Sequence, residues 1–297
     1  MRAIFDVVYF CYTGGVKYKE LATFGQELYY DYSIQAIETF ADISSLAGLR
    51  DKIASILPHK SESTRFRIAS KIIQRFFKSP DAKSPSSAFL KLISRMKDDS
   101  IRRDLLFWRT ARTDLLISAI AEEIFYPFFV LQSLPANYDE HTFRMDNTAS
   151  LFPIDSIITR DLIIKYAKKT WGFESEKTIT LALRILKQAE ILDSVSVAIG
   201  SRHTLGYFPR PHIPSLETFI YCLYEEPLYS GASTVQSLDR IQNGDFAKLF
   251  LLNRLQIDSL LKTAEKEGFI CFISMPGSRH VKLLFPSLEE LVDKLIS

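Results

Sequence analysis

Apolar residues recur every three or four positions through roughly the first 130 residues of the chain, a spacing typical of amphipathic helices. Ser61 and Ser63 are suitable N-terminal caps, and Pro58 and Pro127 each end a run. Gly48 lies where one long run divides into two. The expected helices cover residues 18–32, 33–57, 61–77, 86–97 and 100–125. The pattern therefore predicts an N-terminal helical domain over residues 1–133.

The periodicity weakens over residues 134–153, where Pro, Asn and Asp accumulate. Such a composition is typical of an exposed connection between domains. Beyond it, helical patterns over 156–169 and 175–190 precede an alternating stretch, 195–208, that turns at Gly200-Ser201. The sequence thus predicts a linker over 134–153, followed by two helices and a hairpin.

The same order of elements returns further along the chain. The expected elements are helices over 215–226, 234–252, 256–267 and 288–296 and a hairpin over 269–285. Three landmarks recur: Leu186–Glu190 resembles Leu261–Glu265, 75 positions later, while Gly200–His203 and Phe208-Pro209 recur as Gly277–His280 and Phe285-Pro286, 77 positions later. The recurrence predicts a duplicated unit, in which each strand of the second hairpin is one residue longer.

Two helices followed by a hairpin with a basic tip are the chain order of a winged helix-turn-helix. In that fold the helix before the hairpin lies in the DNA major groove, and the hairpin reaches the backbone or the minor groove. We therefore expect a mainly α protein. Its helical bundle would be followed by two winged-helix-like units with short β-hairpins, over residues 154–212 and 213–297.

Composition agrees with a folded protein, because 47% of the residues are hydrophobic and 24% are charged. No uncharged apolar stretch reaches the ~18 residues that a membrane span needs, so no membrane contact is expected. Residues 3–12 loosely resemble a signal peptide, but Asp6 interrupts them and a buried first segment is the preferred interpretation. The three cysteines form no CxxC pair, which favours a reducing cytoplasm.

Motifs for common enzyme chemistries are missing. The sequence holds no GxGxxG, GxxxxGKS/T, HExxH or GxSxG, and its five histidines lack metal-ligand spacing. The adjacent pairs Glu122-Glu123 and Glu225-Glu226 point about 100° apart on a helix and do not converge. We expect neither catalytic residues, nor a metal, nor a cofactor.

Basic residues are concentrated between Pro58 and Arg103, with twelve Lys or Arg against four Asp or Glu. The expected DNA contacts of this region are Arg65, Arg67, Lys71, Arg75 and Lys78. The last four share one helix face, opposite Phe66, Ile73 and Phe77. A solvated face is the alternative, although such a face normally mixes Glu with Lys.

Further candidates lie in the two winged units. The first unit offers Lys177, Thr180, Arg184 and Lys187 opposite a buried stripe, residue types suited to phosphate and base-edge contact. The second offers Lys262 and Lys266, but carboxylates beside them make a protein-binding or dimerising role equally plausible. The hairpin tips carry Arg202-His203 and Arg279-His280, which suit a minor groove or are simply polar turns.

Several short sequences resemble one known family. They are Tyr-Thr-Gly-Gly at Tyr12–Gly15, Ser-x-Ser-Thr-Arg-x-Arg-Ile-Ala at Ser61–Ala69, the run Arg102–Trp108, the pair Ser175 and Thr178, and Ala189–Leu192. In this order they resemble the BrxA-like component of bacteriophage-exclusion (BREX) defence systems. The resemblance implies a compact, largely helical, non-enzymatic protein that binds double-stranded DNA and works beside a DNA methyltransferase. The fuller C-terminal unit departs from that pattern.

Residues and resemblance predict the same function, which is sequence-tolerant binding of duplex DNA through the Arg67–Lys78 stripe and the Lys177–Lys187 helix. The rival hypothesis is a protein-interaction scaffold whose winged units dock partner subunits. One structural expectation is independent of both: Trp108 is buried against the N-terminal helices, among apolar neighbours that include Leu115 and Leu116.

Overall fold

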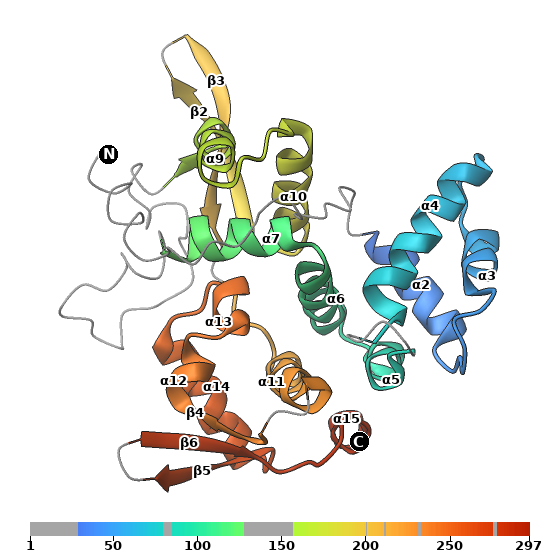
Figure 1. Cartoon of the computed structure of the whole chain (residues 1–297), viewed down its shortest axis with the longest axis vertical. Coiled ribbons are helices and arrows are strands. Elements are labelled where there is room, and N and C mark those ends of the chain that lie inside the picture. Colours follow the sequence, from blue (N-terminus) through green and yellow to red (C-terminus); the bar gives the residue numbers. More distant parts are fainter. Residues whose placement is uncertain are drawn as a thin grey trace. The chain divides into compact units, whose positions relative to one another are not determined.

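The computed structural model describes residues 29–79, 85–127, 157–199, 201–210, 212–230, 233–275 and 278–297. The protein is mainly helical and contains two three-stranded antiparallel sheets (Figure 1). It divides into two compact units, whose described residues fall in Asp114–Pro211 and in Glu27–Thr113 with His212–Ser297. The predicted linker, the expected first segment with its Tyr12–Gly15 motif, and the turn residues Gly200 and Gly277 lie outside the described residues.

The N-terminal helices belong to the second of these units. They are α2 (Tyr30–Phe40), α3 (Leu49–Ile56), α4 (Glu62–Ile72) continued by the π-helix η2 (Ile73–Phe77), α5 (Ser87–Arg95) and α6 (Asp99–Thr113). Gly48 precedes α3 with a φ of 67°, a left-handed conformation that glycine adopts without strain. Ser61 caps α4, because its hydroxyl accepts a hydrogen bond from the Thr64 amide. The predicted break near Gly48 and the predicted cap at Ser61 are both confirmed.

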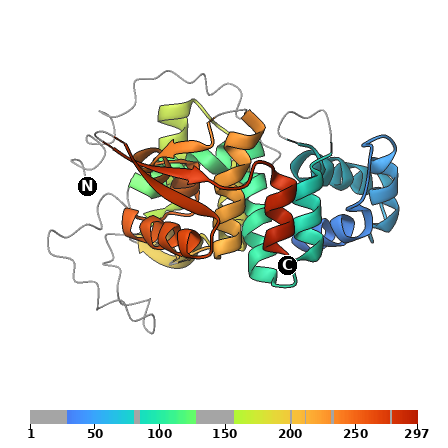
Figure 2. The same cartoon turned by 90° about the horizontal axis from the view of Figure 1, so that it is seen from below.

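The remainder of this unit follows residue 212. Its elements are α11 (Leu216–Ser230), β4 (Val235–Ser237), α12 (Leu238–Gln242), α13 (Asp245–Leu249), α14 (Arg254–Lys266), β5 (Ile270–Met275), β6 (Ser278–Leu283) and α15 (Leu288–Leu295). The sheet order is β4-β6-β5. Helix α15, red in Figure 2, lies beside α5, and Lys91 forms an ion pair with Asp293 between them. The C-terminal helix therefore closes onto the N-terminal bundle.

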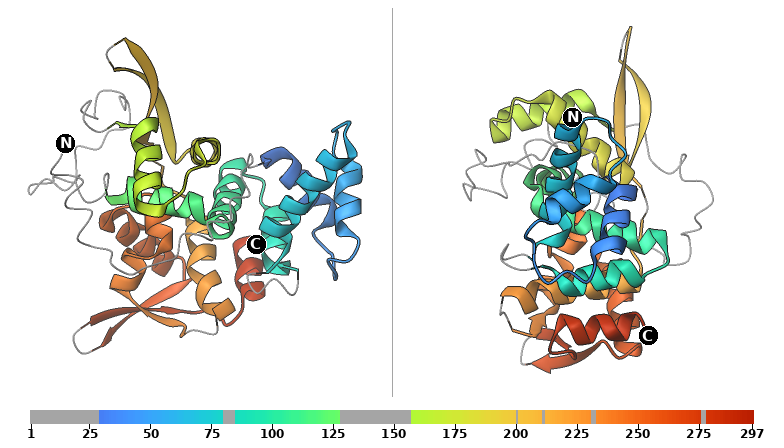
Figure 3. Two further views of the ribbon diagram at one scale, coloured as in Figure 1. Left: turned by 45° about the horizontal axis from the view of Figure 1, so that its top comes forward. Right: turned by 90° about the vertical axis from the view of Figure 1, so that its right-hand side faces the viewer.

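The first unit, Asp114–Pro211, contains the other three-stranded sheet. Its elements are α7 (Leu115–Ala119), the π-helix η3 (Ile120–Phe125), β1 (Ile158–Thr159), α9 (Arg160–Tyr166), the π-helix η6 (Ala167–Trp171), α10 (Glu176–Gln188), β2 (Leu192–Ile199) and β3 (Arg202–Pro209). The sheet order is β1-β3-β2. The gold hairpin β2–β3 extends beyond α9 and α10 of the same unit (Figure 3).

The helix expected over residues 100–125 is wrong in one respect. It ends at Thr113, because Asp114 has an extended backbone, with φ −114° and ψ 91°, and the chain then starts α7 in the other unit. Leu115, expected beside Trp108 in the core, is 50% exposed. An unbroken apolar periodicity therefore concealed a boundary between two compact units.

Each sheet is built by a similar succession of a short strand, helices and a hairpin, with two α-helices in the first case and three in the second. We call β1, α9, α10, β2 and β3 the first module, and β4, α12, α13, α14, β5 and β6 the second. The N-caps Thr159 and Ser237 stand 78 positions apart, and each side chain accepts a hydrogen bond from the backbone amide three residues later. Helices α10 and α14 both contain 13 residues and also begin 78 positions apart. The order agrees with a duplicated unit, at a spacing of 78 rather than 75.

The hairpins follow the same register from the base of each sheet. Thr159 pairs with Gly206 in the first module, and Ser237 pairs with His280 in the second. The first hairpin has eight residues in each strand and the second has six, so the expectation of a longer second hairpin was wrong. As a result the two Gly-Ser-Arg-His copies are not structurally equivalent. Arg202 belongs to the pair next to the turn, whereas Arg279 belongs to the following pair.

Candidate nucleic-acid interface

Helix α10 divides its side chains between a buried and an exposed face. Ser175 stands at its N-cap, and the buried residues are Ile179, Ala182, Leu183, Ile185 and Leu186. Lys177, Arg184 and Lys187 are exposed on the opposite side, where the helical spacing predicted them. These three cations are attached to a rigid helix and are accessible to an anionic partner.

Thr180, the fourth candidate on α10, has a different environment from the one expected. Its Oγ1 donates to the Glu176 carbonyl (2.8 Å) and accepts from Nε of Arg160 (3.0 Å). Its hydroxyl proton is therefore used within the helix, and Thr180 cannot donate to a base edge while these bonds persist. Its role in the structure is to hold Arg160.

Sequence reasoning did not identify Arg160. It is the first residue of α9, and the packing of α9 on α10 brings it to a residue 20 positions away. Burial raises the pKa of Tyr207 on β3 above its ordinary value, and the charges of Arg160 and Arg184 partly oppose this rise. The available signal was its position directly after the cap Thr159, but nothing in the spacing connects it to Thr180.

The hairpin of the first module carries the remaining candidates of this region. Lys187 reaches β2, where its Nζ donates to Ser194 Oγ (2.6 Å) and lies 3.8 Å from Asp193 Oδ1. Arg202 and His203 are both exposed near the turn, and the His203 Nδ1 lies 3.4 Å from Ser196 Oγ. The exposed cations of α10 and those of the hairpin thus belong to one module.

The second module has a different exposed face. Lys262 and Lys266 are exposed on α14, as expected. Between them and the start of the helix lies Asp258, which accepts from Gln242 Nε2 (2.6 Å), and Leu255, which is 53% exposed. Glu265 accepts from the Phe272 amide of β5 (3.0 Å). Carboxylates and a leucine therefore interrupt the cations of α14.

The two candidates on the hairpin of the second module are Arg279 and His280. The Arg279 guanidinium lies 5.3 Å from the ring centre of Phe272, a cation–π distance. His280 is half-buried and lies on the strand that pairs with β4. Arg279 is nevertheless exposed, whereas His280 is more buried than His203 of the first module.

The predicted basic stripe of α4 and η2 is shorter than expected. Arg67 is exposed and Lys71 and Lys78 are half-buried, but Arg75 is only 1% exposed. The π-helix over Ile73–Phe77 explains the difference, because its i→i+5 bonding changes the angle between successive side chains. The expectation that Arg75 faces solvent was wrong. Arg65 lies beside the remaining cations and donates to the His59 carbonyl (3.2 Å).

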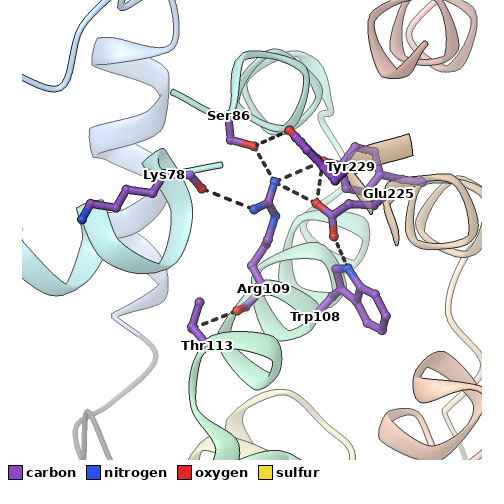
Figure 4. Close-up of polar contacts among 8 residues, drawn as sticks. Lys78, Ser86, Trp108, Arg109, Thr113, Glu225 and Tyr229 are labelled. Carbon is purple, nitrogen blue, oxygen red and sulfur yellow. Dashed lines mark hydrogen bonds and ion pairs between the residues drawn. The ribbon is translucent and has the colours of Figure 1, made fainter. Parts of the chain in front are cut away.

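A buried ion pair occupies the core of the second unit (Figure 4). Arg109 Nη2 lies 2.8 Å from Glu225 Oε1 and also donates to Ser86, and Trp108 Nε1 donates to Glu225 Oε2 (2.6 Å). Burial lowers the pKa of Arg109, but the Glu225 carboxylate together with Tyr221 and Tyr229 more than offsets that effect and holds the pKa above the ordinary value. Trp108 is buried as predicted, but its ring and Nε1 contact Phe246 on α13 and Glu225 on α11, whereas the expected neighbours were the N-terminal helices and apolar residues. Both Glu225 oxygens and both Nη atoms of Arg109 have partners within this unit, whereas the buried Arg109 Nε has none among the described residues.

Lys78 contributes to this cluster only through its backbone. Its carbonyl accepts from Arg109 Nη1 (3.4 Å), while Figure 4 shows its side chain directed away from the buried pair. The Lys78 ammonium therefore remains outside the core, whereas the neighbouring Arg75 does not.

Within the part of the chain that the structure describes, no group of three His, Cys, Asp or Glu side chains could hold a metal ion, and no helix has the length and apolarity to cross a membrane. An open hollow near the start of α10 is lined by three lysines, two carboxylates and Ile164: Lys165, Lys168, Lys169, Asp161 and Glu176. Glu176 accepts from Lys168 (3.0 Å) there, so the charges partly neutralise each other. In comparisons with known proteins, no family model, curated protein or solved structure matches the chain.

Proposed function

We propose that this chain is a non-enzymatic protein that binds double-stranded DNA through its first module, acting as a winged helix-turn-helix. The observation that carries the proposal is the exposed face of α10, where Lys177, Arg184 and Lys187 lie opposite a fully apolar buried face. The helix precedes a hairpin that extends beyond it and carries Arg202 near its turn (Figure 3).

The dimensions of α10 suit a major groove. Thirteen residues give a helix about 20 Å long, and the major groove of B-DNA is about 12 Å wide, which admits one α-helix. Lys177 in its first turn and Arg184 two turns later would reach different phosphates or base edges along the groove. A face of this kind supports sequence-tolerant binding, because phosphate contacts carry no sequence information.

A second, smaller contact surface is proposed on the N-terminal helices. Arg65, Arg67 and Lys71 remain accessible on α4 after the burial of Arg75. Their sign favours an anionic partner, and three contacts would add to the salt dependence of binding by about −0.9 each. We assign this surface a supporting role.

The proposed biological setting follows from the resemblance to BrxA-like proteins. We propose that the chain serves a BREX-like phage-defence system in the cytoplasm and acts there beside a DNA methyltransferase. The short motifs Ser61–Ala69 and Arg102–Trp108 carry this part of the proposal. Both fall on described helices, α4 and α6, whose apolar positions build the core of the second unit.

The alternative function is a protein-interaction scaffold, and one observation favours it for the second module. Leu255 is 53% exposed on α14, and the carboxylates of Asp258 and Glu265 lie along the same helix. A leucine among carboxylates suits a protein partner better than a phosphate backbone. The two functions are compatible if each module has its own partner.

The test is fluorescence anisotropy with a random 20-base-pair duplex over a salt series. Lys177→Gln/Arg184→Gln should weaken binding at least tenfold and make the logarithmic salt slope shallower by about 1.8. The matched control is Arg210→Gln/Lys294→Gln, which removes one exposed cation directly after β3 and one on α15, both outside the proposed contacts. Wild-type protein that fails to bind duplex DNA at about 50 mM salt, where phosphate contacts are strong, would contradict the proposal.

A further inference from the structure

Arg160 is anchored in an unusual way for a surface arginine. It is the first residue of α9, is half-buried, and donates from Nε to Thr180 Oγ1 on α10 at 3.0 Å. Thr180 is fixed in turn by its own bond to the Glu176 carbonyl. A long flexible side chain is thereby held in one orientation by a helix that belongs to the proposed DNA-binding face.

The bond to Thr180 leaves most of the guanidinium available. It uses Nε, whereas Nη1 and Nη2 carry the four remaining donors of the fork. No hydrogen bond or ion pair to these two nitrogens comes from the described residues. The nearest carboxylate of α10, Glu176, is bound by Lys168 at 3.0 Å. Arg160 therefore presents an oriented pair of donors without a protein acceptor in the described part of the chain.

Arg184 is the second cation at this place. It lies four positions after Thr180 on α10, so the two share one helix face, and it is exposed. Because Arg160 is held by Thr180, it lies on the same side of α10 as Arg184, and both cations act on the pKa of Tyr207 in β3. Two guanidinium groups around one point form a site for an anion with several oxygen acceptors, and a backbone phosphate has that chemistry.

The second module lacks this arrangement. At the positions 78 residues later, Leu238 replaces Arg160, Asp258 replaces Thr180, and Lys262 replaces Arg184. Asp258 is bound to Gln242 and would repel a phosphate. Both modules keep the same register over their strand bases and over α10 and α14, so at these three positions the side chains make the difference.

We propose that Arg160 and Arg184 clamp one phosphate of the DNA backbone, with Thr180 as the positioning residue that orients Arg160. This inference rests on the proposed function and names a contact that the α10 face alone does not supply. The clamp fixes the register of the first module on the duplex, because a bidentate arginine binds a phosphate from a defined direction.

Three variants of the full chain test the clamp by anisotropy on the same duplex over a salt series. Arg160→Gln should weaken binding about tenfold and make the salt slope shallower by about 0.9, since one phosphate contact is lost. Arg160→Lys keeps the charge but not the fork, so it should keep the slope and still lose affinity several-fold. Thr180→Val keeps the side-chain shape, keeps the slope and should also lose several-fold, because Arg160 is no longer oriented.

The matched control is Arg210→Gln, which removes one exposed cation close to the same module. If Arg160→Gln and Arg210→Gln share the same affinity and slope, while Lys177→Gln/Arg184→Gln still loses binding, the clamp is refuted and the proposed function stands. If the wild-type chain does not bind the duplex, both fail. Thermal unfolding of each variant shows whether a loss of binding reflects a lost contact or a lost fold. If Arg160→Gln does not fold, Arg160→Lys and Thr180→Val still test whether Arg160 contacts a phosphate.

Discussion

The two modules share a backbone plan and differ at the positions that face outward. Lys177 of the first corresponds to Leu255 of the second, and Lys187 corresponds to Glu265. Both residues reach equivalent places on the first hairpin strand: Lys187 donates to the Ser194 side-chain hydroxyl, whereas Glu265 accepts from the Phe272 backbone amide. The comparison shows that one backbone plan can carry two exposed faces of different charge.

The buried positions explain why the frame is common to both. Ile179 and Leu183 correspond to Ile257 and Leu261, the same residue types 78 positions apart. At two further positions the sizes are exchanged: the first module has Ala182 and Leu186, and the second has Leu260 and Ala264. Over these four pairs the summed volume is kept, and cores tolerate exchanges that keep volume and pattern. The fifth buried position of α10, Ile185, corresponds to the exposed Thr263.

The largest expected effect concerns the buried ion pair between Arg109 and Glu225 in the second unit. Glu225→Gln leaves the Arg109 charge buried without its counter-charge, and losing one partner of a buried pair costs about 3–5 kcal/mol. Urea denaturation should show a correspondingly lower free energy of unfolding. Glu226→Gln is the neighbouring control, because that carboxylate is exposed and pairs with Arg240 at 3.3 Å, so about 0–1 kcal/mol is expected.

The double variant Arg109→Met/Glu225→Leu sharpens this test. Replacing both partners by apolar groups removes the uncompensated charge, so it should recover much of the lost stability. If Glu225→Gln unfolds at the same urea concentration as the wild type, the ion pair does not stabilise the second unit.

The next largest effect on stability is expected at Gly206, because the equivalent position of the second sheet is occupied by a larger residue. A Cβ on Gly206 would lie 2.2 Å from Ile157 Cγ2 and 2.6 Å from Val197 Cγ2, whereas the equivalent residue of the second sheet is His280. Gly206→Ala should therefore lower the free energy of unfolding by about 1–3 kcal/mol, the range for overpacking. Chemical denaturation measures it, with His280→Ala as the tolerant control.

Relief of the clash provides the decisive comparison. Ile157→Ala/Gly206→Ala removes the nearest obstructing group and should be more stable than the sum of the two single changes predicts. Strict additivity would mean that close packing against Ile157 is not the reason for glycine at this position.

A smaller effect is expected when the exposed residues of one module are transferred to the other. Lys177→Leu/Thr180→Asp gives α10 the residues found on α14 and should weaken duplex binding about tenfold, which corresponds to roughly 1.4 kcal/mol. The reciprocal Leu255→Lys/Asp258→Thr should change binding at most a few-fold, because Glu265 remains. Anisotropy at fixed salt measures both. Equal losses in the two modules would remove the functional distinction between them.

Sequence periodicity predicted the fold where local rules decide it. Gly48, Ser61 and the alternating hairpins were found because caps, left-handed glycines and period-two patterns are local. The burial of Arg75 depends on a π-turn, and the break at Asp114 interrupts no apolar pattern. The spacing of apolar residues predicts neither the π-helix nor the helix end before Asp114.

The candidate site was predicted in part for the same reason. Lys177, Arg184 and Lys187 share one helix, so their common face can be read from the sequence. The contact of Arg160 with Thr180 needs the packing of two helices, and the pair of Arg109 with Glu225 joins residues far apart in the chain. The sequence comparison relied in part on the recurrence of Gly200–His203 at a spacing of 77. The structure instead aligns α10 with α14 at a spacing of 78, through their buried residues. The hairpin tips do not align, because the two hairpins differ in length.

The smallest expected effect lies at the position where α10 begins. The hydrogen bond and charge of Lys168 lower the pKa of Glu176, whereas the equivalent residue of the second module is Arg254, which does not titrate in this range. A lowered carboxyl pKa means that the ion pair contributes above the ordinary pKa of Glu and that the contribution is lost as the pH falls through the lowered value. An NMR titration of the Glu176 carboxyl should show this lowered pKa, and Lys168→Met should return it toward the ordinary value. Because Glu176 is exposed, the change in global stability should be too small to detect. If Glu176 titrates at the same pH in the wild type and in Lys168→Met, the contact between Lys168 and Glu176 does not persist in solution.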